Sequence, residues 1–134
     1  MLKKTIIISL CVLMAGCATT YQKNSIFGGY SNSQAPAGYT KVTFNGNGFT
    51  SSLKTKRYAM MRIADLGAQR HRRYFSLYQT MTDIALDRKA SSPAVTTLFD
   101  KPQATAYVKF SNHRSPGEFS VAKIHQKFKN LYHS

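Results

Sequence analysis

One thiol in this sequence has neighbours that suit a covalent modification. Cys17 follows Ala15 and Gly16, which close a charge-free apolar run at positions 5–14, and that run follows a Lys3-Lys4 pair. A run of ten residues is too short for a bilayer-spanning helix, which needs about 20, but it matches the hydrophobic region of a secretory signal peptide, about 7–15 residues. The sequence therefore predicts a signal peptide over residues 1–16, with Cys17 as the first residue of the mature chain.

The residues before Cys17 resemble the lipobox of bacterial lipoproteins, in which a peptidase cuts directly before a cysteine whose thiol carries a diacylglyceryl group. Met14 stands where the lipobox usually has Leu. In such proteins an Asp after the cysteine holds the product at the inner membrane, so Ala18 implies the outer membrane. The resemblance therefore implies lipid attachment at Cys17 and a position at the periplasmic face of the outer membrane. The anchoring should be stable, because a lipoprotein carries several acyl chains.

Two other interpretations of the cysteines exist. Cys11 and Cys17 would pair as a disulfide in a mature secreted protein, or Cys17 would pack inside a buried N-terminal strand or helix. Cleavage before Cys17 removes Cys11 and leaves a single acylated cysteine. The cationic start, the length of the apolar run, the Ala-Gly pair and the polar tract that follows all favour cleavage.

Basic residues dominate the charge of the chain. Nineteen Lys and Arg face five Asp and Glu, which gives a formal net charge of +14, and loss of residues 1–16 leaves +12. This excess attracts nucleic acids, anionic lipids or acidic glycans. Its densest part is opposed only by Asp65 and forms the candidate anion-binding set: Lys54, Lys56, Arg57, Arg70, Arg72 and Arg73.

The predicted compartment narrows the partners of this basic set. A secreted, lipid-anchored protein meets no nucleic acid, so we expect lipid phosphates, lipopolysaccharide, peptidoglycan carboxylates or an envelope protein instead. The alternative is a solvated charged face that binds nothing. We expect salt to weaken any binding that depends on these charges.

The other polar residues form no catalytic pattern. The five acids are scattered, and the histidines have no spacing typical of metal ligands; they are His71, His113, His125 and His133. No H-E-x-x-H or C-x-x-C motif is present. We therefore expect surface histidines, no catalytic residue, no metal and no cofactor. The predicted function is a non-enzymatic structural or protein-interaction module, with an anion-binding module as the alternative.

The elements that must position these residues follow a polar stretch. Residues 17–38 are rich in Ser, Asn, Gln, Gly and Thr, which predicts a lipidated N-terminus and a flexible tether spanning roughly 25 Å. Tyr30 and the Ile26-Phe27 pair interrupt this polarity, which leaves a second possibility, that part of the tether packs on the domain. Residues 39–134 are predicted to form a single domain.

Apolar periodicity defines the predicted elements of that domain. Alternation predicts strands over 39–44, 74–79 and 104–111, and apolar residues spaced three and four apart predict a helix over 51–71. Ser115–Glu118 has the form of a capping box and predicts the start of a second helix, whereas residues 80–103 read as a long excursion. The order predicts an α+β fold: a small three-stranded, or four-stranded, sheet with two helices packed on one face.

Four short motifs resemble a family of small bacterial envelope lipoproteins. They are GGYS (28–31), VTFNGNGFTS (42–51), RIADL (62–66) and RRYFSL (72–77). The family pattern contains G-N-x-x-T, which Gly46, Asn47 and Thr50 match, and a glycine after the helix, where this chain has Gln69–Arg72. The resemblance covers about 50 residues and implies a fold and an envelope location, with no activity attached to it.

Overall fold

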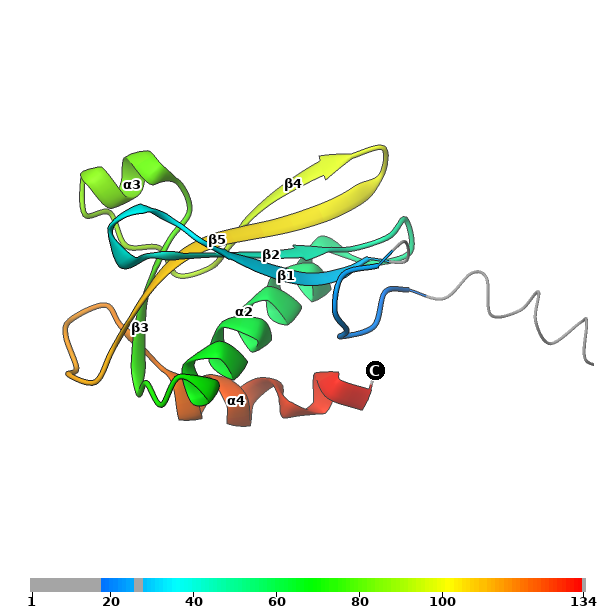
Figure 1. Ribbon diagram of the computed structural model, residues 1–134. Helices are drawn as coiled ribbons and strands as arrows, with labels where there is room; N and C mark the ends of the chain where they lie inside the picture. The colour runs from blue at the N-terminus through cyan, green and yellow to red at the C-terminus, as the bar shows by residue number, and fades with distance from the viewer. Residues whose placement is uncertain (1–17, 26–27, 134) are drawn as a thin grey trace, which may run out of the picture.

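The computed structural model describes residues 18–25 and 28–133, and it folds them into one antiparallel sheet with the two longer α-helices on one face (Figure 1). The strands are β1 (Gly29–Gln34), β2 (Thr40–Asn45), β3 (Tyr74–Tyr78), β4 (Ala94–Leu98), β5 (Lys101–Ser111) and β6 (Phe119–Ser120). The α-helices are α2 (Ser52–Gln69), α3 (Met81–Ala85) and α4 (Val121–Phe128), and the 3₁₀ turns are η1 (Pro36–Gly38) and η2 (Lys129–His133). The strand order is β1-β2-β5-β3-β6, and β4 also pairs with β5.

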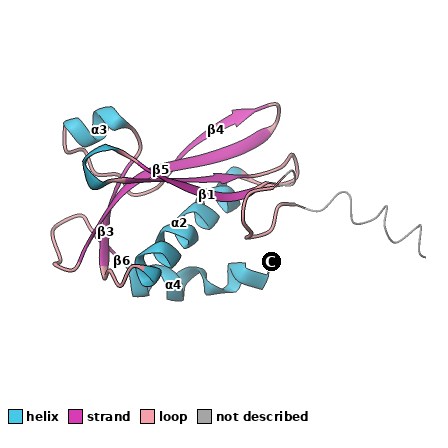
Figure 2. Ribbon diagram, viewed as in Figure 1, coloured by secondary structure: helices cyan, strands magenta, loops and turns pink. Residues whose placement is uncertain are grey.

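Strand β5 organises the sheet because it has neighbours on both edges. One edge pairs with β2, in a register that places Thr105 opposite Thr43. The other edge pairs with β4 along its first half and with β3 along its second half, where Val108 lies opposite Leu77. Alternate β5 residues are fully buried, and Ala106 is typical of them. They face α2 and α4, which lie on the same side of the sheet (Figure 2).

The core forms between this sheet face and the two long helices. The larger cluster joins α2, α4 and strands β2, β3 and β5 through side chains such as Ile63, Leu77 and Ile124. A smaller cluster centres on Phe44 and Tyr58, whose rings lie 4.8 Å apart between centroids. The apolar stripe of α2 is therefore buried from Thr55 to Gly67, which fixes the direction of the helix across the sheet.

The α+β class predicted from the sequence is confirmed, but the predicted number of strands is wrong, because the sheet has six strands rather than three or four. Strand β1 lies inside the predicted flexible tether and pairs with β2 from Gly29↔Asn45 to Gln34↔Thr40. Its residues after Tyr30 are exposed, so backbone bonds hold the strand and no apolar pattern is needed. The stretch predicted as a long excursion contains α3 and β4.

The predicted start of the second helix is also wrong. Helix α4 begins at Val121, and Ser120 caps it by accepting a hydrogen bond from the Lys123 N–H at 3.3 Å. The Ser115–Glu118 stretch forms a turn instead. There the Glu118 carboxylate accepts the Ser115 N–H at 3.1 Å, a contact that a capping box and a tight turn share.

Within the described residues, no helix has both the length and the apolar character to cross a bilayer. The predicted signal peptide (1–16) and the predicted lipid-attachment residue, Cys17, lie outside the described residues. The first residue that can be placed is Ala18, so the chain is followed from the position directly after Cys17.

Candidate anion-binding site

The structure divides the six predicted anion-binding residues between the two ends of α2. Lys54, Lys56 and Arg57 lie in the first two turns and are here called the N-end group. Arg70, Arg72 and Arg73 follow the last turn and are called the C-end group. A helix of 18 residues is about 27 Å long at 1.5 Å per residue. The cluster in the sequence therefore corresponds to two separate surfaces.

A left-handed residue at the end of α2 positions the C-end group. His71 has φ 55°, and its N–H donates to the Ala68 carbonyl at 3.1 Å. The Arg72 N–H donates to the Gly67 carbonyl at 2.8 Å, which completes a Schellman motif. A histidine thus occupies the position where the envelope lipoprotein pattern has glycine. The motif turns the chain back toward α4, where the Val121 N–H donates to the Arg73 carbonyl at 2.9 Å.

Two arginines of the C-end group line one shallow groove. Arg72 and Arg73 lie with Tyr74 and His125 around a hollow of about 440 Å³ beside the first residues of α4; this hollow is called the basic groove. Within the described residues, neither arginine forms an ion pair. Two unneutralised guanidinium groups in one concave surface suit a carboxylate or phosphate, which arginine binds through paired hydrogen bonds.

Arg70 has a different role from its neighbours. Its guanidinium donates to the Thr40 hydroxyl at 2.8 Å and lies 5.5 Å from the centroid of the Phe110 ring. These contacts connect the end of α2 to the start of β2 and to β5. Arg70 does not line the basic groove, so the structure brings together only two of the three residues in the C-end group.

A polar network that was not predicted from the sequence borders the groove. His125 Nε2 lies 2.6 Å from Asp65 Oδ1, and the Tyr21 hydroxyl donates to the other oxygen of Asp65. His125 is at the surface, where it lines the groove, but its ring is also half-buried and bonded, which the sequence did not predict. Sixty residues separate Asp65 from His125, so only the packing of α4 on α2 brings them together. The network joins the N-terminal segment to both helices.

Most of the acidic side chains have partners of their own. Asp83 lies 3.7 Å from Arg88, and the Tyr78 hydroxyl donates to Asp87 at 2.8 Å. Burial, followed by this bond to Asp87, raises the pKa of Tyr78 above its ordinary value. Glu118 accepts from the Ser111 hydroxyl at 3.2 Å, and Asp100 is exposed. With five acids against nineteen Lys and Arg, most of the basic side chains have no carboxylate to neutralise them.

The described residues hold no group of three His, Cys, Asp or Glu side chains placed to bind a metal ion. The Asp65 and His125 pair has the composition of an acid–base couple, but its carboxylate is held by the Tyr21 hydroxyl and its imidazole packs at the α2–α4 contact. The arrangement acts as a fixed link between elements. The chemistry that this end of the molecule offers is recognition of negative charge.

The opposite end of α2 holds the first described residues. Thr19 is only 2% exposed, and its N–H donates to the Thr50 hydroxyl at 2.9 Å. The Thr19 hydroxyl accepts the Asn47 N–H at 2.8 Å. Asn47 closes the turn by accepting the Thr50 hydroxyl at 3.0 Å. The chain is therefore fixed to the domain from the second residue after Cys17, by the Asn and Thr of the G-N-x-x-T motif.

The glycine of the same motif has a steric role. A Cβ on Gly46 would lie 2.9 Å from Thr50 Cβ and 3.0 Å from both Thr55 Oγ1 and Pro102 Cγ. The Gly46 N–H also donates to the Pro102 carbonyl at 2.8 Å, which attaches the β4–β5 hairpin to this turn. The motif spacing was the only signal of this docking site in the sequence, and it did not indicate what docks there.

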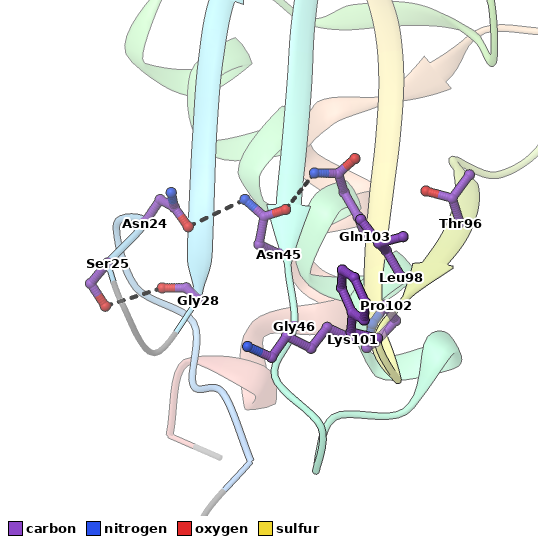
Figure 3. Close-up of a pocket in the computed structure, with 11 residues that line it drawn as sticks. Asn24, Ser25, Gly28, Asn45, Gly46, Thr96, Leu98, Lys101, Pro102 and Gln103 are labelled. Atoms are coloured by element: carbon purple, nitrogen blue, oxygen red, sulfur yellow. Dashed lines mark hydrogen bonds between the residues drawn. The ribbon is translucent and has the colours of Figure 1, made fainter.

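A second hollow, of about 400 Å³, lies beside this turn (Figure 3). Three amides form a row along its edge: Asn45 donates to Asn24 at 3.3 Å, and Gln103 donates to Asn45 at 2.6 Å. Leu98 and Lys101 from the β4–β5 hairpin complete the wall. The hollow shows that the hairpin, the end of β2 and the N-terminal segment are neighbours in space.

Comparisons with protein-family models, with curated proteins and with solved structures found no match to this chain. The resemblance to envelope lipoproteins therefore rests on the four sequence motifs. The two ends of α2 are the places where charge, burial and chain position combine, and they carry the functional proposals.

Proposed function

We propose that this chain is an outer-membrane lipoprotein, attached through Cys17, whose domain is a non-enzymatic interaction module facing the periplasm. The burial of Thr19 is the observation that supports this proposal best. Two residues span at most about 7 Å, so a lipid on Cys17 holds the domain close to the bilayer rather than on a long tether. A protein with one fixed end presents the rest of its surface in a constant direction.

Processing at Cys17 is tested by replacing each cysteine separately. Cys17→Ser should leave the chain uncleaved and without palmitate, because the serine hydroxyl does not form the thioether. Cys11→Ser is the matched control, since Cys11 lies inside the predicted signal peptide, and it should be labelled like the wild type. Palmitate labelling and the mass of the mature chain measure the outcome. Normal labelling of Cys17→Ser would show that the anchor is elsewhere.

The basic groove supports a second candidate function, the binding of an anionic envelope component. Arg72 and Arg73 lie about 27 Å along α2 from the anchored end, so their partner is an anion of the periplasmic space rather than the anchoring membrane. A peptidoglycan carboxylate or an acidic surface on a protein has the required chemistry. The planar, permanently charged guanidinium groups suit either.

Charge reversal tests this second function. Detergent-solubilised mature protein should be retained by purified peptidoglycan sacculi, and Arg72→Glu/Arg73→Glu should weaken retention by about tenfold or more, equivalent to about 1.4 kcal/mol. Lys54→Glu/Lys56→Glu carries the same change of net charge at the other end of α2 and should retain more binding. Retention that persists in 0.5 M salt, or that both variants lose equally, would rule out the groove as the binding site.

A further inference from the structure

Large apolar side chains are concentrated at the N-terminal end of α2. Six large hydrophobic residues of the described chain are exposed, and two of them, Met81 and Leu86, belong to α3 or follow it. The other four surround the turn that holds Thr19 and form what we call the docking face: Phe49 (65% exposed), Leu53 (56%), Leu98 (70%) and Phe99 (86%). Figure 1 places α3 at the opposite end of the molecule from the β4–β5 tip.

These four residues come from separate elements that the fold brings together. Phe49 lies in the β2–α2 turn, and Leu53 lies in the first turn of α2. Leu98 and Phe99 lie at the β4–β5 tip, which the bond between Gly46 and Pro102 holds against the same turn. The first described residues also lie on this side, where Thr19 bonds to Thr50 and Asn47 (Figure 1).

The backbone at the hairpin tip indicates that Phe99 has a use there. Phe99 and Asp100 have φ values of 52° and 60°, which is the left-handed conformation of a two-residue hairpin turn. Asn and Gly are the residues that normally occupy such positions, and a bulky side chain adopts them at a cost. The chain nevertheless places at this tip the most exposed aromatic residue of its described part.

The charges around the docking face match an anionic lipid surface. Lys101 flanks the hairpin tip, and together with the N-end group it opposes a single acid at the tip, Asp100. The Lys54 ammonium nitrogen lies 5.5 Å from the centroid of the Tyr58 ring, which holds this positive charge beside Leu53. Apolar side chains bordered by lysines are typical of surfaces that sit at the headgroup boundary of a bilayer.

We infer that the docking face inserts into the headgroup region of the membrane that carries the anchor. This inference rests on the proposed lipid attachment at Cys17, because attachment two residues before Thr19 brings this end of the domain to the bilayer. Phe49, Leu98 and Phe99 then enter the boundary between headgroups and acyl chains. The lysines contact lipid phosphates, and the domain is oriented by two contacts, the lipid on Cys17 and the docking face.

Tryptophan fluorescence tests the inference without background, because the sequence contains no tryptophan. Lipidated mature protein is reconstituted into phosphatidylethanolamine–phosphatidylglycerol vesicles containing brominated acyl chains. Phe99→Trp should emit at shorter wavelength in vesicles than in detergent-free solution. Compared with vesicles of unbrominated lipid, it should lose roughly half or more of its emission, since insertion by about 5–10 Å brings the ring near the bromines. Phe49→Trp reports from a separate loop and should behave likewise. Leu86→Trp, exposed at the other end, should be unchanged.

The remaining outcomes contradict the inference in distinguishable ways. Flotation of the same vesicles reports the anchor: protein that floats but keeps full emission at Phe99→Trp and Phe49→Trp is anchored without docking. Protein that does not float contradicts the proposed lipoprotein itself. A shift to shorter wavelength without quenching by brominated lipid would mean that a protein surface, such as a second copy of this chain, covers the face instead.

Discussion

The two ends of α2 carry the same kinds of charge in different surroundings. At the N-terminal end, Lys54, Lys56 and Arg57 adjoin exposed apolar side chains and the buried Thr19. At the C-terminal end, Arg72 and Arg73 line a groove beside His125, and none of the large exposed apolar side chains of the described chain belongs to it. The contrast shows that net charge attracts an anion of any kind, whereas the neighbours of the charge select between a lipid surface and a discrete anionic group.

The largest loss of stability is expected when the core side chain behind the basic groove is truncated. Ile124 packs the start of α4 into the main core, and its side chain is almost completely buried. Ile124→Ala should lower the free energy of unfolding by about 2–5 kcal/mol, because it leaves a cavity between α4 and α2. Lys127→Ala, exposed on the same helix, serves as the control and should change stability little. Chemical denaturation measures both.

Ile124→Ala also sharpens the contrast between the ends. Binding to sacculi should fall, since the α4 wall of the groove loses packing against the core, while vesicle docking reported by Phe99→Trp in the same background should persist. Loss of both activities in protein that is still folded would mean that the two surfaces depend on each other and are not separate sites.

A smaller loss of stability is expected when one methyl group is added near the N-terminal end of α2. Gly46→Ala should lower the free energy of unfolding by about 1–3 kcal/mol, because the new Cβ meets Thr50, Thr55 and Pro102 at 2.9–3.0 Å. Gly48→Ala is the matched control two residues away, where a new Cβ would have no heavy atom of the described residues within 4 Å. Thermal unfolding of the two variants gives the comparison. Equal stability would mean that the turn does not hold the Thr19 dock as described.

The sequence patterns predicted those elements whose apolar residues face the core. Strand β5 shows this best: Ala104, Ala106 and Val108 alternate and are fully buried. Helix α2 has a similarly clear stripe. Strand β1 could not be found in this way, because its exposed Ser, Asn and Gln side chains carry no apolar signal and backbone pairing alone places it. The polar composition of this strand was therefore interpreted as that of a flexible tether.

The sequence could predict which residues carry the basic charge, but it could not predict where the fold places them. Lys54 and Arg73 are close in the sequence, but most of the 18-residue helix α2 separates their groups in space. The link between Asp65 and His125 requires the contact of α2 with α4, which no local pattern contains. The same holds for Thr19, whose partners lie about 30 residues further along the chain.

Hydrogen exchange at the Thr19 amide tests the central claim most directly, because both the close anchoring and the orientation of the two ends depend on this residue being fixed. The Thr19 N–H is bonded to Thr50 Oγ1 and buried, and the proposed lipidated mature protein should keep this bond. We predict exchange as slow as that of the paired amides of β2 and β5. Exchange as fast as that of the exposed loop at 113–117 would contradict the account, because the domain would then hang on a free tether.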